Sequence, residues 1–209
     1  MRAILVFASR RFTICFLTLW LLGFVRPAAA QIAASGPTPL SARTLEFWYD
    51  HHIPAHFRAR SRVSVRLLTD RQMVAYLHTA SASDNSHTSS HAAPEDESDI
   101  DGIFENDPPQ ITLRLPSTGE ADPLTFAHEY GHYVWFRLLS REDRRRYEGL
   151  YDHQRAAHRL VTHYADAGLE EGFAEAFSFY AAAPQVLQRR DPLSCQFLAQ
   201  WDAGHPDAR

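Results

Sequence analysis

The pentapeptide His128-Glu129-Tyr130-Gly131-His132 limits what this 209-residue chain can fold into more than any other feature. Residues four apart lie on one face of a helix, so His128 and His132 can bind one metal ion there. Glu129 is turned to the edge of that face, where its carboxylate can reach a water held by the metal. The pattern predicts a zinc site for hydrolysis, with Glu129 as general base. A histidine-rich amphipathic helix with two solvated rings is the alternative interpretation.

The residues around this pentapeptide predict a well-marked helix. Asp122 suits the N-cap and Pro123 the first helical position. Apolar residues then recur at helical spacing over residues 124 to about 139, so one stripe should face the core. Gly131 costs about 1 kcal/mol of helix propensity relative to alanine. We therefore expect another backbone, that of a second metal-binding helix, to approach closely at Gly131.

A second helix is predicted over residues 169–180, before Pro184. Glu171 and Glu175 lie four apart and share a face, and Glu175 stands among phenylalanines and alanines. A buried carboxylate is costly unless it is paired or bound to metal. We therefore interpret Glu171 as the third zinc ligand and Glu175 as the acceptor of an N–H from a zinc-bound imidazole. Glu170 is the rival candidate for the third ligand. In the alternative without a metal, the charge of Glu171 only stabilises the helix N-terminus, and Glu175 pairs with an arginine.

Together the two motifs resemble those of gluzincin metallopeptidases, and more narrowly the catalytic domain of lethal-factor-like zinc peptidases. The resemblance covers roughly residues 100–184. It implies that Glu171 binds zinc, that Glu175 matches the second glutamate of the family motif, and that Tyr164, seven residues before Glu171, assists catalysis. Large domains known in some relatives have no room here, so their substrate recognition does not carry over.

These residues suggest roles in peptide-bond hydrolysis. Three protein ligands leave one zinc position open for water, and Glu129 would take the proton of that water and pass it to the leaving amine. Tyr164 is the best candidate to donate a hydrogen bond to the oxyanion, with His158 and His163 as rivals. The alternative for Tyr164 is an ordinary half-buried aromatic residue.

Residues 110–115 alternate apolar and polar side chains, which is typical of a half-buried strand. Pro108 and Pro109 precede this segment and Pro116 follows it, which suits an edge strand. An edge strand just before the first metal-binding helix could pair with an extended peptide by strand addition. A plain sheet edge without a ligand is the alternative.

The other segments complete an expected α+β, zincin-like metallopeptidase domain, with a small sheet, an edge strand and two zinc-bearing helices. Residues 79–100 are rich in serine, histidine and acidic residues and are predicted to form a mobile loop. Two further helices are predicted near the N-terminus: one over residues 43–60, broken at Pro54, with Phe47, Trp48 and Ile53 inward, and a short one from Thr69 to His78. Between them a strand is predicted with Val63, Val65 and Leu67 inward. An arginine-rich helix is predicted over residues 140–161, and a tail whose Phe197 and Trp201 pack on the core.

The N-terminus predicts a targeting segment. Arg2, Arg10 and Arg11 precede an apolar run over residues 12–25, which is short for a membrane span, and Ala28-Ala29-Ala30 suits a cleavage site. We expect residues 1–30 to be a cleaved signal peptide, residues 31–209 to form a single domain, and the protein to be secreted or periplasmic. An uncleaved anchor is the alternative.

The net charge limits the classes of partner, and the cysteine content limits the possible disulfides. Removal of residues 1–30 takes away four arginines and no acidic residue, so the net charge changes from −4 to −8. This balance speaks against nucleic acid and anionic membrane surfaces as partners. Only Cys195 then remains, so the fold cannot depend on an internal disulfide. The pattern does not indicate an oligomeric state.

The sequence therefore favours an exported zinc-dependent enzyme that hydrolyses a peptide or protein substrate. The same site would serve a zinc amide hydrolase acting on cell-wall peptides. A non-catalytic zinc-containing binding module is the third hypothesis. The intact Glu129 argues against that module, whereas a fourth protein ligand closing the coordination would support it.

Overall fold

The computed structural model describes residues 32–36, 39–59, 62–82 and 100–204. The predicted signal peptide lies outside these residues, and so do residues 83–99 of the predicted mobile loop. Residues 79–82 of that loop belong to a helix. In chain order the elements are β1 (Ile32–Ser35), α1 (Pro39–His52), η1 (Ala55–Phe57), β2 (Val63–Thr69), α2 (Asp70–Ala82), β3 (Gly102–Asn106), β4 (Pro109–Leu115), α3 (Pro123–Tyr133), η3 (Val134–Leu138), α4 (Arg141–Ala156), η4 (Tyr164–Ala167), α5 (Leu169–Ala182), α6 (Pro184–Arg190) and α7 (Pro192–Gly204).

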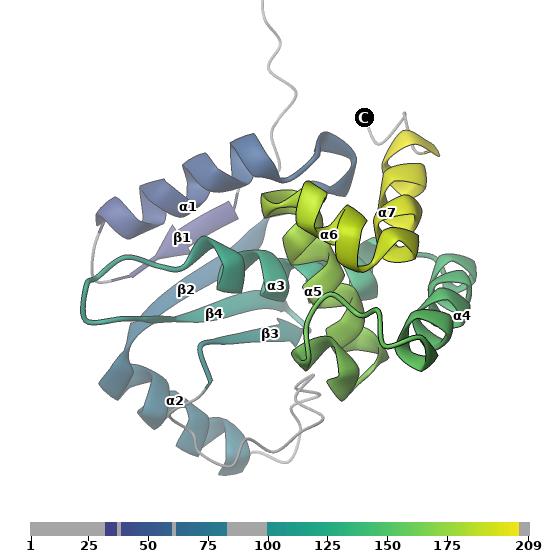
Figure 1. Ribbon diagram of the computed structural model, residues 1–209. Coiled ribbons are helices and arrows are strands. Elements are labelled where there is room, and N and C mark those ends of the chain that lie inside the picture. The colour runs from purple at the N-terminus through teal and green to yellow at the C-terminus, as the bar shows by residue number, and fades with distance from the viewer. Residues whose placement is uncertain (1–31, 37–38, 60–61, 83–99, 205–209) are drawn as a thin grey trace, which may run out of the picture.

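A four-stranded mixed sheet forms one side of the fold, with strand order β1-β2-β4-β3 (Figure 1). Strands β1, β2 and β4 are parallel, and β3 runs antiparallel to β4. The predicted strand over residues 110–115 therefore exists, but the prediction that it forms an edge is wrong. Strand β3 covers it, with Asn106 opposite Pro109. The two prolines mark a hairpin turn and the first residue of β4, a position where proline needs no ladder hydrogen bond.

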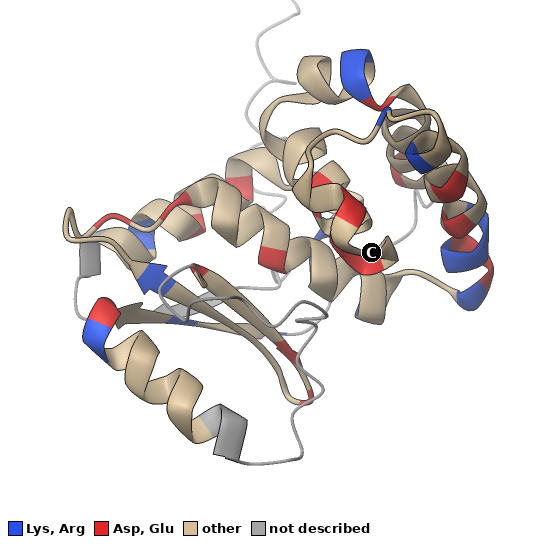
Figure 2. Ribbon diagram, turned by 60° about the horizontal axis from the view of Figure 1, so that its bottom comes forward, with Lys and Arg blue, Asp and Glu red and all other residues tan. Residues whose placement is uncertain are grey.

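Helices cover both faces of the sheet. Figure 2 shows α2 beneath the sheet and α3 above it. Val63, Val65 and Leu67 of β2 are buried, as the alternating pattern predicted. Thr112 of β4 is also fully buried although it points to the opposite face, which is the face where α2 packs. The sheet is thus enclosed on both sides along β4, and its polar face is not simply solvated.

Helix α3 begins as the sequence predicted. The Asp122 side chain accepts hydrogen bonds from the backbone N–H groups of Leu124 (3.2 Å) and Thr125 (3.1 Å), and Pro123 occupies the first turn. After Tyr133 the helix widens into the π-helical segment η3, which ends at Leu138. The helix predicted over residues 124–139 is therefore confirmed, with a change of helical type in its last part.

Helix α5 crosses α3 at the glycine between the two histidines. A Cβ atom built on Gly131 would lie 2.8 Å from the Cα of Ala174 and 3.1 Å from its carbonyl oxygen. Those are backbone atoms, which cannot rotate out of the way, so only glycine allows the two helices to meet at this distance. The expected close approach of a second helix at Gly131 is confirmed.

The remaining helices extend the core on the far side of α5. Tyr147 of α4 and Phe197 of α7 pack against each other, and Trp201 stacks on Phe57. The C-terminal tail therefore packs on the core, as predicted. Cys195 is buried and free. The predicted inward position of Phe47 is wrong, because this side chain is 61% exposed.

Helix α4 is shorter than the predicted segment and ends at Ala156. A capping box between Ser140 and Asp143 fixes the start of α4. Charged residues of both signs lie along the helix (Figure 2). In the part of the chain that the structure describes, no helix is long and apolar enough to cross a membrane.

Candidate metal site

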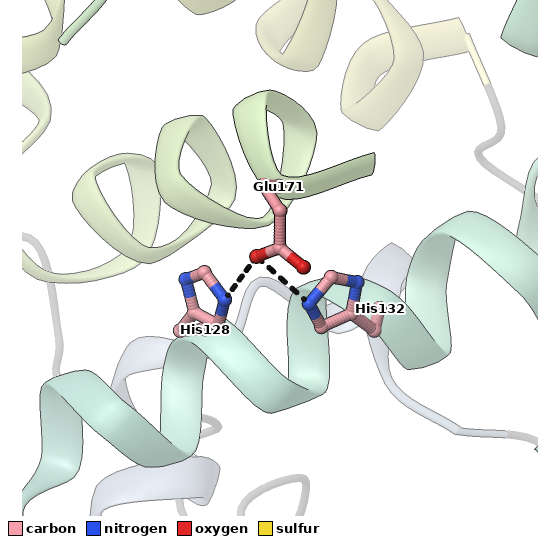
Figure 3. Close-up of side chains that lie close together, drawn as sticks. All are labelled: His128, His132 and Glu171. Atoms are coloured by element: carbon pink, nitrogen blue, oxygen red, sulfur yellow. Dashed lines mark hydrogen bonds and ion pairs between the residues drawn. The ribbon is translucent and has the colours of Figure 1, made fainter. Parts of the chain in front are cut away.

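Three side chains converge where α3 and α5 cross. His128 and His132 project from one face of α3, and Glu171 reaches between them from the first turn of α5 (Figure 3). The Oε2 atom of Glu171 lies 3.1 Å from Nε2 of His128 and 3.5 Å from Nε2 of His132. The structure therefore brings together the three residues that the sequence selected as metal ligands.

The spacing of these atoms fits a metal ion. A tetrahedral zinc ion with bonds of about 2.0–2.1 Å holds its ligand atoms roughly 3.3–3.4 Å apart. The two separations from Glu171 lie on either side of that value, and all three ligand atoms lie within 4.8 Å of one another. Two imidazoles and one carboxylate also form a donor set suited to zinc. Among the described residues, no fourth histidine, cysteine or acidic side chain joins the group.

The candidate ligands and Glu175 strongly shift the pKa values of their neighbours. Burial disfavours the charged form of His128 and so lowers its pKa. The hydrogen-bonded carboxylates of Glu171 and Glu175 outweigh burial and raise the pKa of His128 to about 10. Burial likewise opposes ionisation of Glu171, but the hydrogen bonds from His128 and His132 prevail and lower its pKa to about 2. Glu171 therefore stays an anion, the form in which a carboxylate binds metal.

Glu175 holds the outer nitrogen of His128. Its Oε1 atom lies 2.9 Å from Nδ1 of His128, and its Oε2 atom accepts a hydrogen bond of 2.6 Å from the hydroxyl of Thr162. The same hydroxyl accepts the backbone N–H of Ala165, at 3.1 Å. This chain of contacts, the Thr162–Glu175–His128 relay, turns Nε2 of His128 toward Glu171. The sequence anticipated the contact between Glu175 and an imidazole, whereas Thr162 carried no signal along the chain.

Glu129 lies beside the three candidate ligands but outside their cluster. Its side chain is 7% exposed and faces the beginning of β3, where Gly102 lies against it. Burial raises the pKa of Glu129, and the neighbouring His128 and His132 partly oppose this rise. The carboxylate is therefore easier to protonate than an exposed glutamate. Sequence reasoning missed both Gly102 and its strand, although the dipeptide Pro108-Pro109 was an available turn signal before β4.

Tyr164 lies at the rim of the site, on η4. Its ring centroid is 5.6 Å from that of His128, and the side chain is 56% exposed. Partial desolvation is the main cause that raises the pKa of Tyr164, and the nearby carboxylates of Glu171 and Glu129 raise it further. The phenol therefore keeps its proton. The structure thus places Tyr164 beside the three candidate ligands, as the family resemblance implied.

The rival candidates lie elsewhere. His158 and His163 are exposed and line a pocket of about 210 Å³ together with Thr162, Arg155, Asp166 and Arg190. Glu170 is half-buried and does not belong to the group of three candidate ligands. The geometry therefore favours Glu171 over Glu170, and Tyr164 over the two histidines.

Comparison with known proteins identifies the fold. No family model and no curated protein matches the chain. Among solved structures, it is similar to the Pro-Pro endopeptidase PPEP-2 from Paenibacillus alvei, with a TM-score of 0.50 and 15% sequence identity over 80% of this chain and 96% of that chain. At this identity the likeness establishes the fold alone and does not establish the lethal-factor-like family. The chain thus has a mixed α+β fold like that of an endopeptidase.

Proposed function

We propose that the protein is an exported zinc-dependent metallopeptidase. The observation that carries the proposal is the meeting of His128, His132 and Glu171, with the Glu171 carboxylate 3.1 Å and 3.5 Å from the two imidazole nitrogens, on a fold similar to that of an endopeptidase. The intact HExxH sequence and the lack of a fourth protein ligand among the described residues support a catalytic site, because a catalytic zinc keeps one position open.

Glu129 is the proposed general base. When bound, zinc supplies a Lewis acid that polarises the peptide carbonyl and lowers the pKa of water. Glu129 then takes a proton from the attacking water onto its carboxylate and delivers it to the nitrogen of the leaving amine. Burial supports this role, because it raises the pKa of Glu129 toward the working range of a proton carrier.

Tyr164 is the proposed oxyanion donor. Its phenol remains protonated, since desolvation and the nearby carboxylates raise its pKa. An O–H group held at the rim beside His128 can donate to the carbonyl oxygen as negative charge develops there. The exposure of Tyr164 also suits a group that must contact substrate.

Strand β3 is the proposed guide for the substrate backbone. Among the described strands it is an outer strand of the sheet, and its first residue lies against Glu129. An extended peptide added along this edge would therefore pass the general base. The solved relative is named for acting at Pro-Pro, so a Pro-Pro peptide is the first substrate to test.

Zinc stoichiometry and peptide cleavage, measured on the same samples of the purified chain, test the proposal. We expect one zinc per chain and cleavage of at least one peptide in a panel that includes Pro-Pro. Glu171→Ala should lose both, while Glu129→Ala should keep zinc and lose cleavage. Glu170→Ala is the matched control and should keep both.

Each other outcome changes a definite part of the proposal. Loss of zinc in Glu170→Ala instead of Glu171→Ala would move the third ligand by one residue. Zinc without peptide cleavage would favour a binding module, or a cell-wall amide hydrolase if cell-wall peptides are cleaved. A folded chain without zinc would remove the metallopeptidase proposal altogether. Export predicts that the exported form begins at Gln31, which N-terminal sequencing would reveal.

A further inference from the structure

Gly102 lies against the side chain of Glu129, the proposed general base, along most of the length of that side chain. A Cβ atom built on Gly102 would lie 2.6 Å from Oε1 of Glu129, 2.7 Å from Cγ and 2.9 Å from Cδ. All three distances are shorter than those that real Cβ atoms show, so no larger residue fits while Glu129 keeps its position. The backbone of Gly102 is not in the left-handed region. The need for glycine here comes from Glu129 and not from the local backbone conformation.

Neither backbone is free to move away from this contact. Gly102 pairs with Leu113, a buried residue of the central strand β4. Glu129 is followed along α3 by Tyr130, which is fully buried. A side chain added at position 102 would therefore be accommodated by rotation of the Glu129 side chain, because rotation about its single bonds costs less than moving a strand or a helix in a close-packed core.

Packing, and not hydrogen bonding, fixes the carboxylate of Glu129. Among the described residues, the structure gives this carboxylate no hydrogen-bond partner, in contrast to Glu171 and Glu175. Charge acts on it through His128 and His132, but charge alone does not select a rotamer. The backbone of Gly102 is thus the wall against which the side chain rests.

We propose that Gly102 is a positioning residue that fixes the proton-accepting conformer of Glu129. The inference rests on the proposed peptidase function, in which the carboxylate must lie within reach of the attacking water. A displacement of about 1 Å at a reacting group can lower a rate by roughly 100-fold. Replacing the hydrogen on Gly102 with a methyl group would therefore affect turnover while leaving the candidate metal ligands in place.

Gly102→Ala tests this inference, with Gly149→Ala as the matched control, since a Cβ at Gly149 meets no atom within 4 Å. We expect Gly102→Ala to lower kcat by roughly 10- to 100-fold, with KM and zinc content close to those of the wild type. Gly149→Ala should leave all three unchanged. An unchanged kcat in Gly102→Ala would overturn the inference.

A thermal-stability cycle gives a readout that does not depend on activity. Gly102→Ala should lower the Tm of the wild-type chain, but it should lower it little or not at all in a Glu129→Ala background, where the clashing atoms are gone. Folding of the double variant when Gly102→Ala alone fails to fold would support the contact equally. An equal loss of stability in both backgrounds would overturn the inference, because it would show that Gly102 serves only the strand.

The two proposals fail in distinguishable ways. A wild-type chain that cleaves peptides, beside a fully active Gly102→Ala variant, removes the positioning role and leaves the peptidase proposal standing. A wild-type chain that cleaves nothing removes the proposed function, and with it any catalytic role of Gly102.

Discussion

The two imidazoles of the site lie one turn apart on α3 and are held in different ways. His128 is held by hydrogen bonds, through Glu175 to Thr162. His132 is 2% exposed, and its buried Nδ1 atom has no hydrogen-bond partner among the described residues. Close packing surrounds it instead, beside the crossing of α3 and α5 at Gly131.

This difference shows that the side chains of one candidate metal site can be positioned by two physical means. A charge-assisted hydrogen bond sets the direction of a ring and depends on one partner atom. Close packing restricts a ring through many weak contacts, and it fails only when the neighbouring backbone moves. Substitutions in the relay should therefore alter chemistry and metal affinity, whereas substitutions at the helix crossing should alter stability first.

Among the substitutions that test this contrast, the largest effect is expected at the His128 end of the site, from Tyr164→Phe. Phenylalanine keeps the ring beside His128 and removes only the hydroxyl. Loss of an oxyanion donor typically costs about 100-fold in kcat, so turnover should fall by roughly that factor with unchanged zinc content. Steady-state kinetics and metal analysis measure both quantities. The exposed neighbour His163 provides the control: His163→Ala should be neutral, and an unchanged rate in Tyr164→Phe would remove Tyr164 from the mechanism.

The next effect should come from breaking the relay with Glu175→Ala. Removing the partner of a metal-bound histidine typically weakens metal affinity about 10- to 100-fold. We expect that loss here, with a smaller one for Glu175→Gln, whose side-chain oxygen can still accept from His128. Competition with a zinc chelator measures the affinities. Thr162→Val should weaken zinc less than Glu175→Ala does; equal effects would mean that the hydroxyl of Thr162, and not the carboxylate of Glu175, limits the orientation of the ring.

The smallest effect on chemistry, but a clear one on stability, is expected for Gly131→Ala. The added methyl group would press on the backbone of Ala174. Overpacking of this kind costs about 1–3 kcal/mol in the free energy of unfolding. Denaturant titration of the metal-free chain measures it, with Gly149→Ala on the open side of α4 as control. Alanine also gains about 1 kcal/mol of helix propensity over glycine at either position, so Gly131→Ala is judged against Gly149→Ala. A stability gain in Gly131→Ala equal to that in Gly149→Ala would show that α3 and α5 can separate without cost, and the contrast between the two histidines would then fail.

The parts of the site that lie within one helix could be predicted from the sequence. Asp122 and Pro123 mark the start of α3, and the spacings between His128 and His132 and between Glu171 and Glu175 each correspond to about one helical turn. Such patterns are local, since the period of the helix alone decides which side chains share a face. The crossing at Gly131 was also foreseeable, because a glycine inside a helix costs stability unless something must approach it.

The parts that depend on contacts between distant segments could not be predicted. The contact of Gly102 with Glu129 requires β3 to pair with β4, and the hydrogen bond of Thr162 to Glu175 requires the loop before α5 to fold back on that helix. The exposure of Phe47 depends on which side of α1 meets the sheet, which helical spacing by itself does not decide. The edge position of β4 was mistaken for the same reason, because prolines that suit an edge also suit a hairpin turn.

The division of the candidate metal ligands between two helices also has a consequence for the order in which the site is built. His128 and His132 lie on α3, but Glu171 follows 39 residues after His132. A growing chain therefore contains both imidazoles well before it contains the carboxylate between them. Even then the three ligands meet only after α5 has docked across Gly131. The full ligand set thus arises late in biosynthesis, as a product of tertiary folding.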